Sequence, residues 1–230
     1  NMNSKNDYLL IGNTRLHWAK KIGNIYKFSH SILHKPFPKK ISIKNLLWAS
    51  VGKYETNIFR KENEIKTTDI NLRNFPKHFG VDRALGSFAA LTNTYNPFKK
   101  DIVIADFGTI LSITKINYEG YLIGGQLIPG FITQLSSMEI ATKNLKMPDE
   151  LTIPKDNFLV NTEDAMLKGV ENSLIGAINL AFNPNKDLLI ICGGDSAMIR
   201  SNFLRGSKEI LIKPNLVMEG MIMFCQKNKF

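Results

Sequence analysis

Two glycine-containing bends in this chain carry residues that could bind phosphate. Gly12-Asn13-Thr14-Arg15 follows one apolar run, and Asp106-Phe107-Gly108-Thr109 follows another. Because glycine has no side chain, the backbone N–H groups of such a bend can approach an anion closely, and the threonine adds a hydroxyl donor. The pair of bends predicts two phosphate-binding hairpins, although two ordinary β-turns would use the same residue types.

Two aspartates, Asp82 and Asp106, could serve a phosphoryl transfer as proton acceptor and as cation ligand. Asp106 ends an apolar run, where it could hold a cation that neutralises phosphate charge or could close an Asx-turn. Asp82 belongs to Gly80-Val81-Asp82-Arg83, which opens a helical pattern. It could cap that helix. It could also accept the proton of a hydroxyl that attacks a phosphoryl group, while Arg83 anchors an anionic part of the substrate.

A glycine pair, Gly193-Gly194, follows a buried strand that is predicted at residues 188–192. Bare backbone at this point would let an adenosine or its phosphates lie against the chain. A plain strand-to-helix turn is the alternative interpretation.

The elements that must position these residues occur twice. Each copy has an apolar strand, a glycine bend, a second strand, a turn and a third strand. The repeat predicts two α/β lobes, residues 2–96 and 97–230, with a boundary near Asn96-Pro97. The predicted strands are residues 8–11, 16–19 and 25–28 in the first copy and residues 102–105, 110–116 and 121–127 in the second.

Helical patterning separates and follows the two copies. Apolar residues recur at helical spacing over residues 83–94 and over residues 163–181, the latter with Thr162 as its predicted N-cap. A further helix is predicted over residues 195–203, after the glycine pair.

The composition of the 230 residues excludes several classes of protein. Mean hydropathy is -0.12, and no apolar run approaches the roughly 20 residues that span a bilayer. Cys192 and Cys225 stand far apart and form neither a disulfide framework nor a zinc motif. The net charge of +10 comes from scattered lysines, with one basic run at residues 35–40. A solvated basic surface is expected, because a nucleic-acid-binding motif with interleaved aromatic residues is not found. These features predict a soluble, cytoplasmic protein.

Taken in order, the motifs resemble the type III pantothenate kinase family of the sugar kinase, heat-shock chaperone and actin superfamily. The resemblance implies an α/β fold of duplicated actin-like (ribonuclease H-like) lobes with the active site in the cleft between them. The motifs span nearly the whole chain: Ile11-Gly12-Asn13-Thr14-Arg15, Gly80-Val81-Asp82-Arg83, Asp106-Phe107-Gly108-Thr109, Gly124-Gly125-Gln126-Leu127-Ile128-Pro129-Gly130, Asn161-Thr162, Gly193-Gly194-Asp195 and Pro214-Asn215-Leu216-Val217-Met218-Glu219-Gly220.

This resemblance implies a function and a set of site residues. The family transfers the γ-phosphate of ATP, with Mg²⁺, to the hydroxyl of pantothenate, the first step towards coenzyme A. Its members are homodimers, and neither a nucleic acid nor a membrane is an expected partner. By similarity, Asp82 is the proton acceptor and Asp106 is the ligand of a monovalent cation, K⁺ or NH₄⁺. The implied pantothenate contacts are Gly80, Val81, Asp82, Arg83 and Thr162, and the implied ATP contacts are Gly12, Asn13, Thr14, Arg15, Thr109, Gly193 and Gly194.

One position departs from the family pattern. The first motif of the family usually reads Asp-x-Gly-Asn-Thr, and the Asp position is Leu10 here. Asp7 cannot replace it, since residues three apart on a strand point to opposite faces. The Leu10 side chain is expected to face the cleft, so Leu10→Asp is expected to tighten ATP binding or to raise turnover. The alternatives are an active kinase that relies on Asp106, a weak one, or a catalytically silent relative that acts as a regulatory or binding protein.

Overall fold

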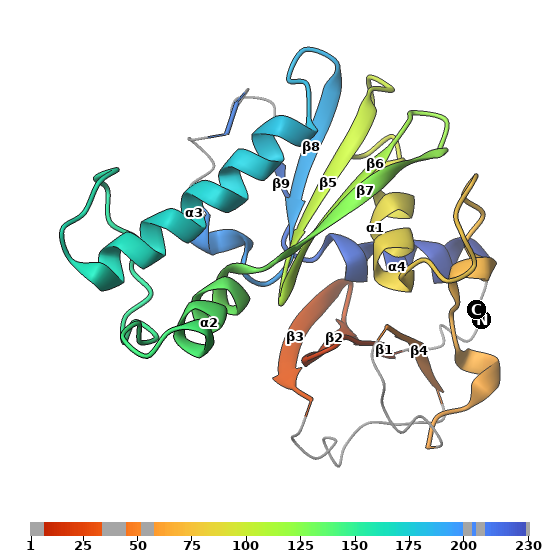
Figure 1. Ribbon diagram of the computed structural model, residues 1–230. Helices are drawn as coiled ribbons and strands as arrows, with labels where there is room; N and C mark the ends of the chain where they lie inside the picture. The colour runs from red at the N-terminus through yellow and green to blue at the C-terminus, as the bar shows by residue number, and fades with distance from the viewer. Residues whose placement is uncertain (1–6, 34–44, 52–57, 200–203, 206–209, 229–230) are drawn as a thin grey trace. The chain divides into compact units, whose positions relative to one another are not determined.

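The structure is a computed structural model that describes residues 7–33, 45–51, 58–199, 204–205 and 210–228. The basic run at residues 35–40 lies outside these ranges. The chain divides into two compact units, each of which is described by itself below (Figure 1). The first unit comprises Asn1–Pro97, Glu119–Leu122 and Asn215–Phe230, and the second comprises Phe98–Tyr118 and Ile123–Pro214. The sequence placed all of residues 97–230 in the second lobe, whereas the end of the chain groups with the first unit.

The first unit is built on a four-stranded sheet in the order β3-β2-β1-β4. Strand β1 runs antiparallel to β2 and parallel to β4. The three strands predicted at the N-terminus are present, and two of them are longer than expected because the β2–β3 hairpin continues to either side of the Gly23 turn. The strands are β1 (Asp7–Ile11), β2 (Arg15–Ile22), β3 (Ile25–Ile32) and β4 (Leu46–Ser50).

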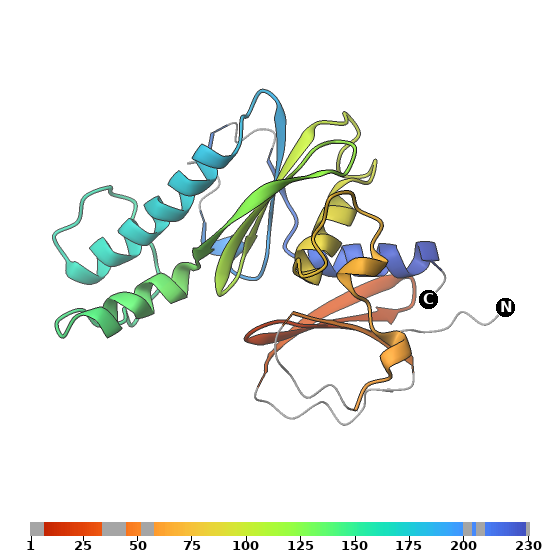
Figure 2. The same cartoon turned by 45° about the vertical axis from the view of Figure 1, so that its right-hand side comes forward.

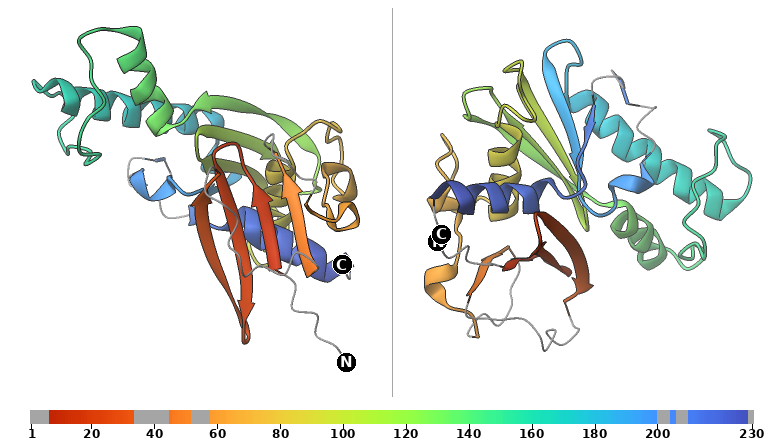
Figure 3. Two further views of the ribbon diagram at one scale, coloured as in Figure 1. Left: turned by 90° about the horizontal axis from the view of Figure 1, so that it is seen from below. Right: turned by 180° about the vertical axis from the view of Figure 1, so that it is seen from behind.

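Helices α1 (Val81–Ala90) and α4 (Leu216–Asn228) lie together on one face of this sheet, as Figure 3 shows for α4. Tyr8 and Leu10 of β1 point to that face, where they join apolar side chains of both helices. The helices approach each other closely: a Cβ on Gly220 would lie 2.1 Å from the Leu85 oxygen. Short 3-10 turns, Lys61–Asn63 and Thr67–Asp69, lead from β4 towards α1.

The second unit contains a five-stranded sheet in the order β7-β6-β5-β8-β9. Strand β5 runs antiparallel to β6 and parallel to β8, which repeats the relation of β1 to β2 and β4. The duplication predicted from the sequence is therefore present in the topology. The strands are β5 (Asp101–Phe107), β6 (Ile110–Ile116), β7 (Leu122–Pro129), β8 (Asp187–Cys192) and β9 (Leu211–Ile212).

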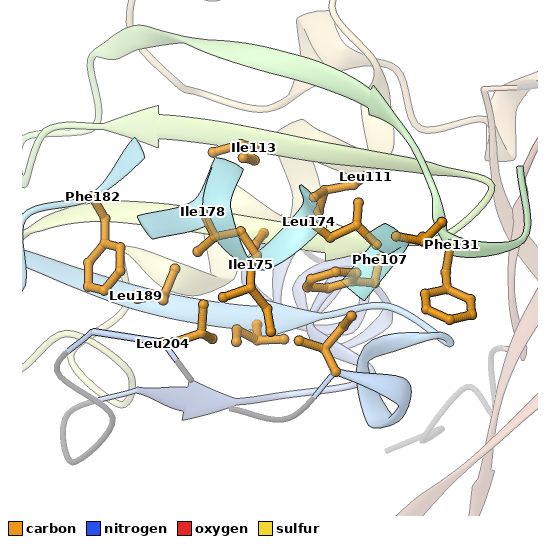
Figure 4. Packing of buried hydrophobic residues seen from close by; sticks show 14 of the residues in the cluster. Phe107, Leu111, Ile113, Phe131, Leu174, Ile175, Ile178, Phe182, Leu189 and Leu204 are labelled. Atoms are coloured by element: carbon orange, nitrogen blue, oxygen red, sulfur yellow. The ribbon is translucent and has the colours of Figure 1, made fainter. Parts of the chain in front are cut away.

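Helices α2 (Phe131–Ala141) and α3 (Thr162–Ala181) pack against each other in the second unit (Figure 2). The buried side chains of α3 meet those of the sheet in one large apolar cluster, part of which Figure 4 shows. The predicted N-cap is shifted by one residue, because the Asn161 side chain accepts the hydrogen bond from the Asp164 N–H at 3.0 Å.

The helix predicted over residues 195–203 is wrong in its described part. A single 3-10 turn, Ser196–Met198, follows the glycine pair. Its backbone bonds join residues three apart, from Met198 to Asp195 and from Ile199 to Ser196. Residues 200–203 lie outside the described residues.

Two further observations concern membrane-spanning helices and the cysteines. Within the described ranges, no helix is long and apolar enough to cross a bilayer. Cys192 and Cys225 are both buried, and neither forms a disulfide bond.

Candidate active site

The first bend of the duplicated unit is closed by its own backbone. The Gly12 N–H donates to the Arg15 carbonyl at 2.9 Å. A Cβ on Gly12 would lie 3.0 Å from that carbonyl oxygen, which explains the glycine. Since the Gly12 N–H is used within the bend, an approaching anion would meet Asn13, Thr14 and Arg15, all three of which are exposed.

The second bend repeats this arrangement and is held by the start of α2. The Gly108 N–H donates to the Ile110 carbonyl at 3.3 Å. The Thr109 carbonyl accepts two hydrogen bonds, from the Gly130 N–H at 2.9 Å and from the Thr133 hydroxyl at 2.6 Å. A Cβ on Gly130 would lie 2.0 Å from the Gly108 oxygen, so only glycine fits there. The exposed Thr109 is thus fixed in place by α2.

Asp106 and Gly193 lie against each other at the ends of neighbouring strands. Asp106 is half-buried on β5 and pairs in register with Cys192 on β8. Gly193 has a φ of 90°, and a Cβ there would lie 2.4 Å from Asp106 Oδ1 and 2.2 Å from the Phe107 oxygen. The Asp106 carboxylate therefore lies against the Gly193 backbone, where the sequence had predicted room for a nucleotide.

The backbone around Gly193 is held from two further directions. The Gly193 N–H donates to the Pro214 carbonyl at 3.1 Å, and the Asp195 N–H donates to the Phe107 carbonyl at 3.2 Å. Gly194 is exposed beside them. The second unit thus brings together Asp106 and the glycine pair.

The Asp82 carboxylate folds back over the N-terminus of α1. Its Oδ1 accepts a hydrogen bond from the Arg83 N–H at 2.8 Å. A Cβ on Gly80 would lie 2.5 Å from the same oxygen, so the glycine makes room for the carboxylate. Burial raises the pKa of the Asp82 carboxyl, and the hydrogen bond from Arg83 and the Arg83 charge oppose that rise only in part.

Arg83 is held by aromatic side chains that precede α1. Its guanidinium lies over the Phe79 ring, with the central carbon 4.2 Å from the ring centroid. Phe79 in turn makes an edge-to-face contact with Phe75, and its carbonyl accepts a hydrogen bond from the Thr67 hydroxyl at 2.6 Å. This support presents Asp82 and Arg83 together from one rigid helix start.

The structure corrects two expectations, the direction of the Leu10 side chain and the capping role of Thr162. Leu10 is only 5% exposed and packs in the core of the first unit with Val81 and Ala84 of α1, not towards an open site. Thr162 is exposed in the first turn of α3, where the neighbouring Asn161 makes the cap.

The structure adds a feature that sequence reasoning missed. His17 and His30 are cross-strand partners on β2 and β3, with their Nδ1 atoms 2.7 Å apart. The sequence could have predicted this pair. A two-residue turn at Gly23-Asn24 fixes the register of the hairpin, and in that register residue 17 lies opposite residue 30.

Metal ligands are sparse in the described ranges. No group of three His, Cys, Asp or Glu side chains is found there. A cation at Asp106 would therefore take its remaining ligands from backbone carbonyls, nucleotide or water, as hard cations commonly do.

Comparison with known proteins identifies the family. A family model for the type III pantothenate kinases matches residues 48–183, more than half of the chain. This chain belongs to that family. A type III pantothenate kinase from Synechocystis sp. is 29% identical, and the alignment covers 93% of this chain and 87% of that protein. Another from Pseudoalteromonas translucida is 30% identical over 63% of this chain and 61% of that protein.

Solved structures with low identity share the fold. A Baf family protein from Campylobacter jejuni matches with a TM-score of 0.67 at 18% identity, covering 97% of this chain and 98% of that one. The ADPNP-bound activator of 2-hydroxyisocaproyl-CoA dehydratase from Clostridium difficile matches with a TM-score of 0.54 at 12% identity, covering 98% and 97%. An archaeal actin homologue in complex with ADP gives 0.51 at 14% identity, covering 98% and 99%. The predicted actin-like fold is confirmed.

Proposed function

We propose that this chain is a pantothenate kinase, which transfers the γ-phosphoryl group of ATP to the hydroxyl group of pantothenate. The observation that carries the proposal is the half-buried Asp82 carboxylate at the start of α1, which accepts a hydrogen bond from the Arg83 N–H and has a raised pKa. Membership of the type III pantothenate kinase family supplies the substrates.

Asp82 acts as the general base of the transfer. As the pantothenate hydroxyl oxygen bonds to the γ-phosphorus, its proton passes to the carboxylate, and ADP leaves with the electrons of the broken P–O bond. A carboxylate with a raised pKa is a better proton acceptor than an exposed one. Because of the same raised pKa, the Asp82 carboxylate becomes protonated, and so stops acting as a base, at a higher pH than an ordinary carboxylate does.

Pantothenate is an anion, and Arg83 is placed to hold it. The guanidinium is oriented by the Phe79 ring, and the planar fork of an arginine matches the two oxygens of a carboxylate. We assign the pantothenate contacts to Gly80 through Arg83, together with Thr162.

The nucleotide is assigned to the two glycine bends and the glycine pair. Asn13, Thr14 and Arg15 offer exposed donors at the first bend, and Thr109 offers a hydroxyl at the second. Backbone donors at bends of this kind hold phosphate oxygens without long side chains. The exposed Gly194 offers backbone without a side chain to the rest of the nucleotide, and Gly193 lets the Asp106 carboxylate lie beside it.

Asp106 fits a monovalent cation such as K⁺ or NH₄⁺. Its Oδ1 lies beside the Phe107 and Gly193 backbone, which brings together carboxylate and carbonyl oxygens, the ligand types that hard cations take. When bound, the cation would offset phosphate charge, and Mg²⁺ would arrive with ATP. A homodimer in the cytoplasm is part of the same proposal, by likeness to the family.

The test is ADP release measured with pantothenate as acceptor, for the parent and for Asp82→Asn. Loss of a general base lowers turnover by about 10²–10⁴-fold, and the variant should melt at least as high as the parent because it removes a buried charge. Asp156→Asn, at an exposed position, is the matched control. Near-normal turnover in Asp82→Asn would leave Asp82 as a helix cap only.

A second candidate is a catalytically silent relative that binds the same ligands and serves as a regulatory or binding protein. The burial of Leu10 at the usual Asp position favours it, because one carboxylate of the family pattern is replaced by core packing. Binding of ATP without ADP release, in K⁺ and with pantothenate present, would select this candidate.

A further inference from the structure

A pair of histidines in the first unit lies directly beside the Gly12–Arg15 bend. The rings of His17 and His30 meet edge to face, with centroids 4.9 Å apart, and their Nδ1 atoms are 2.7 Å apart. At this distance one nitrogen donates its N–H and the other accepts with its lone pair. The bond would be lost if both nitrogens carried a proton, so the pair can gain at most one proton while it stays intact.

The free nitrogen of His17 points at the bend. Its Nε2 lies 3.5 Å from the position that a Cβ on Gly12 would occupy. Arg15 stands two residues before His17 on β2, and its positive charge acts on both rings. The partner of His17 on β1 is Leu10, and the next residue across the sheet is Ala49 on β4, so neither strand adds a charge there.

The elements packed on this face carry further titratable groups, and the formal charges of those on the two helices cancel. The groups are Tyr8 on β1, Tyr26 on β3, Asp82 and Arg83 on α1, and Glu219, Cys225 and Lys227 on α4. Burial raises the pKa of Tyr8 and of Cys225, which keeps both neutral at neutral pH. The charged neighbour of Asp82 is Arg83.

Without an anion at the bend, the pair is neutral. Burial, followed by the proximity of His30 and of Arg15, lowers the pKa of His17 to about 4. Burial and Arg15 also lower the pKa of His30. Each ring then holds a single proton at neutral pH, and one of the two lies between the Nδ1 atoms.

We propose that the His17–His30 pair takes up one proton from solvent when the phosphate groups of a nucleotide bind at the Gly12–Arg15 bend. This rests on the proposed function, which assigns the bend to the nucleotide. Phosphate oxygens beside Arg15 offset its charge and place negative charge near His17, which favours the protonated form against the burial that otherwise keeps the rings neutral. The pair then holds three ring protons, the bond between the Nδ1 atoms becomes charge-assisted, and His17 donates Nε2–H towards the phosphate.

Nucleotide affinity is then expected to fall as pH rises. The pKa of the pair is higher in the bound state than in the free state, so binding is tightest in acid and weakens as pH rises through the bound-state pKa. Uptake of one proton limits the change to about tenfold in affinity per pH unit.

Calorimetry of ADP binding in two buffers with different ionisation enthalpies measures the proton uptake. The parent should take up a larger fraction of a proton than His30→Gln or His17→Gln at about pH 6.5, near the ordinary pKa of histidine. The ionisation of ADP itself is common to all the titrations and cancels. His78→Gln removes an exposed histidine of the same unit and should match the parent.

The outcomes separate this proposal from the proposed function. Equal proton uptake by the parent and His30→Gln, with ADP bound by both, would overturn the role of the pair and leave the kinase assignment untouched. No ADP binding by the folded parent would overturn both.

Discussion

Leu10→Asp restores the residue that the family usually has, and the structure predicts that it will harm the protein. Leu10 is buried in the apolar cluster between β1 and α1. The substitution loses about 1.5–3 kcal/mol of apolar burial and adds a buried carboxylate, which costs several kcal/mol when ionised and unpaired. We expect a loss of about 3–5 kcal/mol in the free energy of unfolding near pH 8.

The pH dependence of this loss identifies its cause. Burial raises the pKa of the new carboxyl in the folded state above its unfolded value of about 4. The folded state therefore prefers the protonated form, and the stability loss is smallest in acid and grows as pH rises from the unfolded pKa to the folded one. Leu10→Asn introduces a side chain of nearly the same shape as aspartate but without a charge. It should lose stability by an amount that does not change with pH.

Urea unfolding of the parent and both variants at about pH 5 and about pH 8 measures these differences, on either side of the raised pKa that burial gives a carboxyl. ADP release by the folded variant should not exceed that of the parent, contrary to the gain expected from the sequence alone. The reasoning fails if Leu10→Asp is as stable as the parent at the higher pH. It also fails if the loss for Leu10→Asp, like that for Leu10→Asn, is equal at both pH values, because burial would then not have raised the pKa of the new carboxyl.

Two further predictions concern the second unit. If Asp106 holds a monovalent cation, turnover should be much higher in K⁺ or NH₄⁺ than in Na⁺, and Asp106→Ala should lose both this difference and most activity; equal rates in Na⁺ and K⁺ would count against the assignment. Gly193→Ala places a Cβ 2.2 Å from the Phe107 oxygen at a φ of 90°, so it should cost more than about 3 kcal/mol in urea unfolding. Gly176→Ala, on α3, would bring its Cβ within 4 Å of no atom beyond its chain neighbours and the backbone of its own helix turns. It should instead be neutral or stabilising by about 1 kcal/mol, and similar values for both variants would refute the close approach at Gly193.

The parts of the fold that depend on local chemistry could be predicted from the sequence. Glycine at each bend, with an apolar strand before it, indicated both hairpins, because a bend of this kind needs a residue without a Cβ. The cap of α3 was missed by one residue, since Asn161 and Thr162 are both good capping residues and only the geometry decides between them.

The parts that depend on distant contacts could not be predicted. The burial of Leu10 follows from Val81 and Ala84 of α1 covering its face of the sheet, about seventy residues later in the chain. The short turn after Gly193 follows from hydrogen bonds that tie Gly193 to Pro214 and Asp195 to Phe107. Periodicity within residues 195–203 carries no information about those partners.

The contact between α4 and α1 determines when the packing around α1 can form during synthesis. Helix α1 carries Asp82, and its backbone at Leu85 is met by Gly220, which lies 135 residues later in the chain. During synthesis, α1 leaves the ribosome with one side still uncovered, and it stays so until α4 emerges. An early stop codon that removes α4 would spare every proposed catalytic and ligand-binding residue and still leave the helix of the proposed base without its support.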